Sequence, residues 1–93
     1  MNRTEFETAC QSQGYREIVD RRMDANATNP EHSHEFDAQL LVLEGEMTII
    51  SEGRNDTYRA GDTFAMTAGC RHIERSGTEG VRYLAGRRYQ EAR

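Results

Sequence analysis

The hydrophobic pattern of the chain consists of short apolar runs separated by glycine-containing turns. Residues 40–43 (LLVL) and 47–50 (MTII) flank Glu44-Gly45, which predicts a β-hairpin. Further turn signals lie at residues 53–56, 60–62, 68–69 and 76–80, and residues 63–66 and 81–87 are predicted strands. Strands and turns at this spacing are typical of an all-β sandwich or barrel.

The N-terminal segment has a different pattern. Residues 4–13 (TEFETACQSQ) predict a short helix, in which Thr4 and Glu7 have the spacing of a capping box and Gly14 follows the last turn. Phe6 and Cys10 lie four residues apart, so we expect this face of the helix to pack on the rest of the protein. Residues 15–23 predict a strand, and residues 26–31 (NATNPE), which hold the only proline, predict a loop.

The composition indicates one small domain with a sparse core. Leu, Ile, Val and Phe make up about 15% of the 93 residues, below the ~20% at which disorder becomes an alternative. The net charge of −4 and the single proline favour a folded chain. A core this small needs support from disulfides, a metal or oligomerisation. With only Cys10 and Cys70 available, we expect a metal or a dimer rather than a disulfide.

The charge distribution excludes several classes of partner. The 12 basic residues are all arginine, against 16 acidic residues, and no basic run favours nucleic acid or an anionic membrane. We expect the Arg87-Arg88 pair to be solvated. No apolar stretch reaches the ~20 residues of a membrane span, and the N-terminus lacks the apolar centre of a signal peptide. These patterns predict a cytoplasmic protein.

Three histidines carry the candidate chemistry. His32 and His34 form an H-x-H pair, and in an extended segment both rings would point to the same face. Imidazole nitrogens at such a position suit a divalent transition metal. The alternative is a pair of solvated loop histidines.

The sequence around the histidines resembles the two motifs of the cupin family. In the first motif, H-x-H precedes a ligand position, here Ala38, and a turn glycine, here Gly45. In the second, a glycine, here Gly61, precedes a ligand histidine, here His72, at the motif's spacing. The resemblance covers residues 15–88 and accounts for every histidine.

This resemblance implies an RmlC-like, double-stranded β-helix or jelly-roll barrel with a short N-terminal helix. It also implies that His32, His34 and His72 are ligands of one metal, with Fe, Zn, Ni, Mn and Cu all open. Ala38 stands where cupins commonly carry a glutamate ligand, so the site resembles the three-histidine cupins, which include thiol and diketone dioxygenases. The expected function is a dioxygenase-type reaction on a small chelating acid, thiol or diketone. The alternative is a non-catalytic, sensor-like module that binds a small ligand.

Several polar residues are candidates to complete the site. Glu74 lies two residues beyond His72 and on a strand shares its face, so it is the possible catalytic base or a carboxylate ligand. The alternative for Glu74 is a position at the rim, facing Arg71 or Arg75. Asp37 is expected to form a hydrogen bond at the start of a strand, with contact to the metal as the alternative.

Other residues are candidates for the cavity wall. Leu40 and Val42 share the phase of Ala38, and Phe64 follows the same alternation on a later strand, although filling of the core explains them equally well. Cys70 precedes His72 by two residues, which places it either beside the metal site or in the core as a small apolar residue. Gln39 is expected to point outward.

The predicted organisation is a helical arm at residues 1–14 and a cupin barrel at residues 15–93. A homodimer is expected, because pairing of sheet faces or exchange of an edge strand would add apolar burial to a thin barrel.

Overall fold

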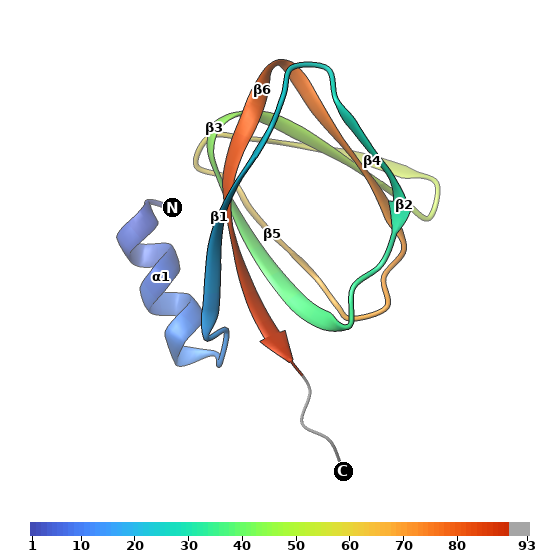
Figure 1. Cartoon of the computed structure of the whole chain (residues 1–93). Coiled ribbons are helices and arrows are strands. Elements are labelled where there is room, and N and C mark those ends of the chain that lie inside the picture. The colour runs from blue at the N-terminus through green and yellow to red at the C-terminus, as the bar shows by residue number, and fades with distance from the viewer. Residues whose placement is uncertain (90–93) are drawn as a thin grey trace.

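The computed structural model describes residues 1–89, which form one helix and a set of antiparallel strands around a common interior (Figure 1). The elements are α1 (Arg3–Ser12), β1 (Glu17–Met23), β2 (Thr28–His32), β3 (Phe36–Ser51), β4 (Arg54–Arg59), β5 (Thr63–Met66) and β6 (His72–Tyr89). The all-β fold with a short N-terminal helix is confirmed. The last four residues assigned to the predicted barrel, 90–93, lie outside the described residues.

Two long strands, β3 and β6, build both walls of the barrel (Figure 1). The first half of β3 and the second half of β6 pair with each other and are flanked by β5 and β1. The second half of β3 and the first half of β6 also pair, flanked by β4 and β2. This is the facing arrangement of a jelly roll, in which the walls share their central strands.

The hairpin predicted at Glu44-Gly45 is wrong, and so is the turn predicted at residues 76–80. The chain continues through both segments as strand, and the β3–β6 register shifts between Val42 and Glu44 and again between Gly45 and Met47. Such shifts are β-bulges, which bend a strand without reversing it. The hairpin that follows β3 has its turn after the next apolar run, residues 47–50. This turn is at Glu52-Gly53, where both residues have positive φ.

The bulges also exchange the inward and outward positions of the strands. Ala38, Leu40 and Val42 face the interior in the first half of β3, whereas Met47 and Ile49 do so in the second half. In β6 the buried positions change in the same way, from His72, Glu74 and Ser76 to Val81, Tyr83 and Ala85. Without this exchange, one half of each strand would turn its apolar residues to solvent.

Gly45 and Gly80 make the bend possible. Both have positive φ (74° and 75°), and a Cβ on Gly45 would lie 2.0 Å from the Gly80 carbonyl oxygen. The two backbones therefore meet with no room for a side chain. Glycine is required here for both its conformation and its size.

The loop predicted at residues 26–31 is partly wrong, because Thr28–His32 forms β2. This strand pairs with β6 through Thr28, Asn29 and His32, and its register is interrupted between Asn29 and His32. Pro30 lies in this interruption. Proline cannot donate to a β-ladder but is tolerated at an edge or a bulge, so the turn-like sequence still forms a strand.

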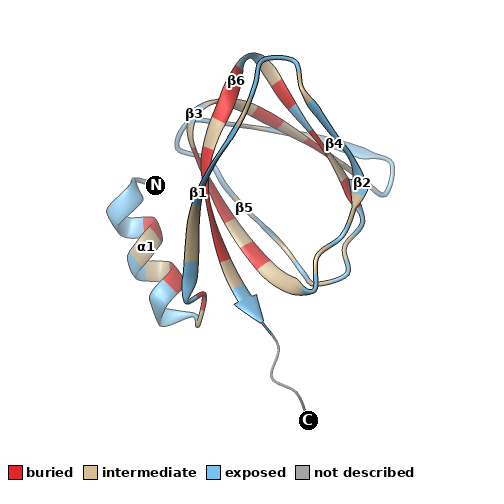
Figure 2. Cartoon of the chain, in the orientation of Figure 1, coloured by how far each residue is buried: buried red, intermediate tan, exposed pale blue. Residues whose placement is uncertain are grey.

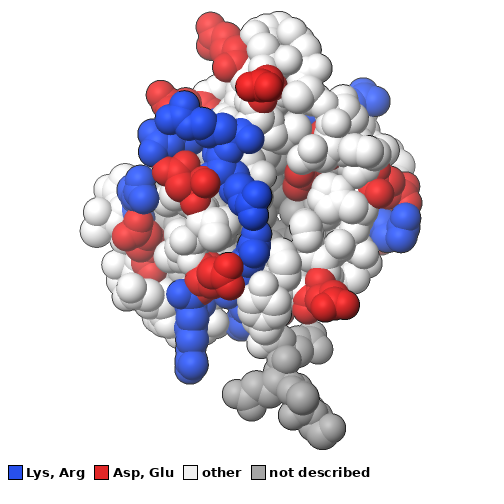
Figure 3. Space-filling view, in the orientation of Figure 1, with Lys and Arg blue, Asp and Glu red and all other residues white. Residues whose placement is uncertain are grey.

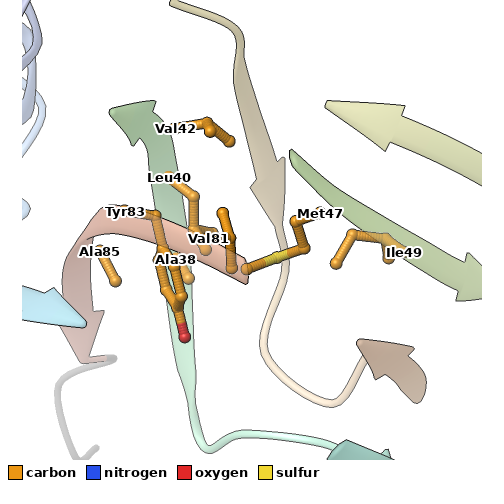
Figure 4. Packing of buried hydrophobic residues seen from close by; sticks show 8 residues of the cluster. All are labelled: Ala38, Leu40, Val42, Met47, Ile49, Val81, Tyr83 and Ala85. Atoms are coloured by element: carbon orange, nitrogen blue, oxygen red, sulfur yellow. The ribbon is translucent and has the colours of Figure 1, made fainter. Parts of the chain in front are cut away.

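The main core lies between the two walls (Figure 4). Alternate residues of β3 and β6 supply it, and the burial colours follow these two strands (Figure 2). Its buried members are Ala38, Leu40, Val42, Met47, Ile49, Val81, Tyr83 and Ala85. The resulting interior is apolar in its middle, with the histidines at one end of β2 and β6.

Helix α1 covers the outside of one wall rather than entering the barrel (Figure 1). Phe6 and Cys10 are buried against Leu41 and Leu84, as the predicted apolar stripe requires. The capping box is formed by Asn2 and Glu5, not by Thr4 and Glu7. Asn2 accepts the Glu5 N–H at 2.8 Å, and Glu7 instead pairs with Arg3 at 2.9 Å.

Arginine and acidic side chains are interspersed over the face shown in Figure 3. Several are ion-paired on the surface, with 2.7 Å between Arg82 and Asp20 and 2.6 Å between Arg71 and Glu31. No helix among residues 1–89 has the length and apolar character needed to cross a membrane.

The contact between Gly45 and Gly80 leads to a stability prediction. Gly45→Ala should lower the free energy of unfolding by about 3 kcal/mol or more, because the methyl group adds a backbone clash to the cost of a left-handed residue. Gly53→Ala is the matched control, since Gly53 has a φ of 76° but nothing within 4 Å of the added Cβ. It should cost about 1 kcal/mol. Urea unfolding of both variants measures the difference, and equal losses would contradict the proposed role of the contact.

Candidate metal centre

The three histidines converge at one end of the barrel interior. His32 ends β2 and pairs directly with His72, which begins β6, while His34 lies in the short connection to β3. The ring centroids are 4.4 Å apart for His32 and His72, 4.8 Å for His32 and His34, and 5.5 Å for His34 and His72. Segments forty residues apart in sequence thus bring their imidazoles into contact.

Glu74 adds a carboxylate to this group. It is only 5% exposed, and its Oε2 lies 3.3 Å from Nε2 of His72 and 3.9 Å from Nε2 of His32. Its other oxygen accepts a hydrogen bond from Nδ2 of Asn29 at 2.9 Å. The rim position considered for Glu74 does not occur. His32, His34, His72 and Glu74 each offer one ligand atom within 4.8 Å of the others, and we call these four residues the donor quartet.

The backbone determines which nitrogen of two histidines carries the proton. Nδ1 of His72 lies 3.0 Å from the Cys70 carbonyl oxygen, and Nδ1 of His32 lies 2.7 Å from the Pro30 carbonyl oxygen. A carbonyl oxygen can only accept, so both Nδ1 atoms donate. In the neutral rings, Nε2 then presents a lone pair toward Glu74.

The result is a buried carboxylate faced by imidazole lone pairs. Acceptors in such contact repel unless a cation lies between them, either an additional proton on a ring or a metal ion. Nitrogen and carboxylate oxygen are donors that divalent transition metals accept, and Nδ1–H bonds to carbonyls are typical of metal-binding histidines. The donor quartet therefore fits a metal ion.

The surroundings of His34 favour the neutral form of its ring, which is the form that binds a metal ion. Burial, and then the neighbouring rings of His32 and His72, lower the pKa of His34 below its usual value. Its ring stacks on Phe36, with 4.7 Å between centroids. The neutral, positioned imidazole has a lone pair available for coordination.

A cavity of about 170 Å³ adjoins the donor quartet. One part is polar and another is a wall of apolar side chains. Its lining consists of Arg21, Asn29, His32, His34, Phe36, Ala38, Leu40, Met66, Glu74, Tyr83, Ala85 and Arg87. Burial, and then the charge of Glu74, raises the pKa of Tyr83 to about 12, so its phenol stays protonated at neutral pH.

Comparison with known proteins gives the family. The Cupin_2 family model, described as a cupin domain, matches residues 20–85. The chain belongs to the cupin family. The match includes both long strands up to Ala85 and all four residues of the donor quartet.

Solved structures agree on the fold. A protein of unknown function from Rhizobium leguminosarum superposes with a TM-score of 0.74 at 22% identity, covering 78% of this chain and 69% of that one. An RmlC-like cupin from Shewanella frigidimarina gives 0.66 at 24% identity, covering 80% and 67%. The polyketide cyclase RemF from Streptomyces resistomycificus gives 0.67 at 24% identity, covering 75% and 52%.

One curated protein also matches part of the chain. The endoribonuclease YbeY of Myxococcus xanthus is 35% identical over 54 residues, which are 58% of this chain but 18% of that protein. The chain thus spans under a fifth of the length of this relative.

Within the cupin barrel, the commonly expected glutamate position is held by a small residue. Ala38 is 5% exposed and lines the cavity with Leu40. The carboxylate of the quartet comes instead from Glu74, on the strand that carries His72. Strand phase was the signal that made Glu74 a candidate.

Other candidates lie elsewhere. Val42 is buried deeper in the core, and Phe64 stacks on Tyr58 with 4.1 Å between centroids. Cys70 lines a separate surface depression, with its Sγ 3.7 Å from Oγ of Ser51. Cys70 precedes β6, so the two-residue alternation of a strand does not apply to it.

Asp37 and Gln39 face away from the donor quartet. Asp37 accepts the Ala68 N–H at 2.8 Å and pairs with Arg88 at 3.0 Å, and these two contacts hold the pKa of Asp37 below its usual value. Gln39 donates to Gln13 at 3.1 Å, on the outer face as expected.

Four of the polar residues that line the cavity were not predicted from the sequence. Asn29 lay in a predicted loop, and Arg21 and Tyr83 lay on strands of unknown register. Arg87 was expected to be solvated, but its side chain is 20% exposed and lines the cavity. Its spacing from Val81 and Ala85 was the available signal, because alternate residues of a strand share a face.

The repulsion between the Glu74 carboxylate and the imidazole lone pairs leads to a prediction for the metal-free protein. After treatment with a chelator at pH 8, Glu74→Gln should raise the free energy of unfolding by about 1 kcal/mol. The amide can donate to Nε2 of His72 and still accept from Asn29. Glu79→Gln, an exposed position of the same strand, is the control and should change little. Urea unfolding measures both. A marked loss for Glu74→Gln would show instead that the quartet is held together by a protonated histidine.

Proposed function

We propose that this cupin holds one divalent transition metal ion through His32, His34, His72 and Glu74, and acts as a metal-dependent enzyme on a small molecule bound in the adjoining cavity. The observation that carries the proposal is the donor quartet itself. Its four donor atoms lie close together, backbone carbonyls set the tautomers of His32 and His72, and the group adjoins a cavity.

The surrounding residues support a positioned site. The hydrogen bond from Asn29 orients the Glu74 carboxylate so that one oxygen remains for coordination. His72 is 1% exposed, which keeps water from its ring. When bound, the metal would supply Lewis-acid or redox chemistry to a ligand that adds its own donors.

Within this class we propose a dioxygenase-type oxidoreductase that acts on a small chelating acid, thiol or diketone. The donor quartet differs from the three-histidine set first considered, because Glu74 adds a negative charge to the ion. The cavity volume limits the substrate to a small molecule. Fold likeness does not identify the reaction, since one fold can host many unrelated functions.

A non-catalytic binding module is the second candidate, and one observation favours it. Among the described cavity residues, Glu74 is engaged in the quartet and Tyr83 stays protonated, with a pKa of about 12. Neither is then free to act as a general base. Turnover of a chelating substrate by protein loaded with Fe²⁺ would favour the enzyme, and binding without turnover would favour the module.

We propose that the protein is a cytoplasmic homodimer, in which each chain has a helical arm at residues 1–14 and a cupin barrel at residues 15–93. Sedimentation at micromolar concentration distinguishes a dimer from a monomer of 10.6 kDa.

The proposed metal site leads to a binding prediction. Protein purified without a nickel column should contain one metal ion per chain, identified by elemental analysis. Asn29→Leu should weaken Zn²⁺ binding about 10- to 100-fold, because the Glu74 carboxylate loses the bond that orients it. Competition with a chromophoric chelator measures the affinity.

The control for this prediction is Asn55→Leu, at an exposed position of β4. It should leave the Zn²⁺ affinity unchanged. Metal should also be released as the pH falls, because protons compete with the metal for the imidazole nitrogens. Wild-type protein that binds no metal at pH 8 would refute the proposed function.

A further inference from the structure

Two arginines line the cavity beside the donor quartet: Arg87, which is largely buried, and Arg21, whose side chain is exposed. Arg87 continues the inward alternation of Val81, Tyr83 and Ala85 along β6. Its guanidinium carbon lies 4.8 Å from the centroid of Phe36, whose ring stacks on His34. The Arg87 guanidinium and the His34 imidazole therefore both pack against the ring of Phe36.

The charge of Arg87 is only partly compensated. Its Nη1 lies 3.4 Å from a carboxylate oxygen of Glu17, which is half exposed. Its Nε is buried and has no hydrogen-bond partner among residues 1–89. Buried polar groups of this kind are rare in folded proteins and indicate a missing partner.

Arg21 shares the strand phase of Val19 and Met23, which pack on the core, and its exposed side chain lines the open part of the cavity. It is directly opposite Tyr83 in the β1–β6 register, and both residues line the cavity. In the described part of the chain, Arg21 forms no ion pair. By contrast, Arg82 on the outer face has a carboxylate oxygen of Asp20 at 2.7 Å.

These groups make the loaded cavity electropositive. Among residues 1–89, the carboxylates near a divalent ion and the two guanidinium groups would be those of Glu74 and Glu17. The wall between them is apolar and includes Phe36 and Leu40. Such walls weaken screening and strengthen the attraction for an anion.

We propose that Arg21 and Arg87 bind the carboxylate of a small organic acid, whose other end offers a donor atom to the metal. The inference rests on the proposed function and selects the acid from its three substrate classes. The guanidinium fork suits a carboxylate, and Arg87 is already positioned by Phe36. An uncharged ligand of the same shape would leave Arg21 without a counter-charge and Arg87 with only the half-exposed carboxylate of Glu17.

Paired probes test this selection. Imidazole-4-acetate and imidazole-4-acetamide carry the same nitrogen donor and differ in the charge at the other end. Calorimetry on protein loaded with Co²⁺, together with its visible spectrum, measures the affinity and the entry of the imidazole at the metal. Wild type should bind the acetate about tenfold or more tightly than the amide.

Variants assign the preference to the arginines. Arg21→Gln and Arg87→Gln should each reduce it several-fold, whereas Arg22→Gln should retain it, because Arg22 alternates to the outer face of β1. If Arg87→Gln does not fold, Arg87→Lys replaces it in the test. Lysine keeps the charge but lacks the guanidinium fork, so this variant should also reduce the preference. Equal affinities of wild type for the two probes, or a full preference in both Arg21→Gln and Arg87→Gln, would overturn the proposal.

Uptake of Co²⁺ is measured first and reports separately on the metal site. If wild type binds no Co²⁺, the proposed function fails, and acetate against acetamide is titrated into the metal-free protein by following the arginine Nε–H resonances. A shift of Arg87 with acetate alone then supports the anion site. No shift with either compound overturns it.

Discussion

The contact between the backbones of Gly45 and Gly80 is the constraint on which the rest of the structure depends. It allows β3 and β6 to bend where the two walls meet, so that each strand serves both walls. The bulges at this point exchange inward and outward positions, and both halves of each strand then face the same interior. Glu74 and Arg87, near opposite ends of β6, can for this reason line one cavity.

The donor quartet is costly for the fold and useful for chemistry. A barrel with a sparse apolar core buries Glu74 and turns imidazole lone pairs toward it, although apolar residues would be more stable there. The carbonyls of Pro30 and Cys70 hold this arrangement by accepting the Nδ1 protons. Local rules of stability are commonly broken at functional sites, and the binding of a cation removes the conflict.

The sequence predicted the class of fold and the grouping of the three histidines, but not the course of the long strands. Gly45 and Gly80 produce the same signal at a bulge as in a hairpin, because both require positive φ. Pro30 marked β2 as a loop, yet an edge strand tolerates proline at a bulge. The two-residue alternation of a strand identified Glu74 from the position of His72 alone, since both residues lie within one uninterrupted part of β6.

The residues that sequence missed are those whose position depends on pairing between strands. Arg21 faces the cavity only because β1 aligns it with Tyr83, and a shift of one residue would turn Arg22 inward instead. Asn29 donates to Glu74 from β2, a strand whose sequence is typical of a loop. Register thus decides which of these two exposed arginines lines the cavity. The same composition could form an apolar barrel with a charged exterior, and it is the register that places positive charge beside the donor quartet.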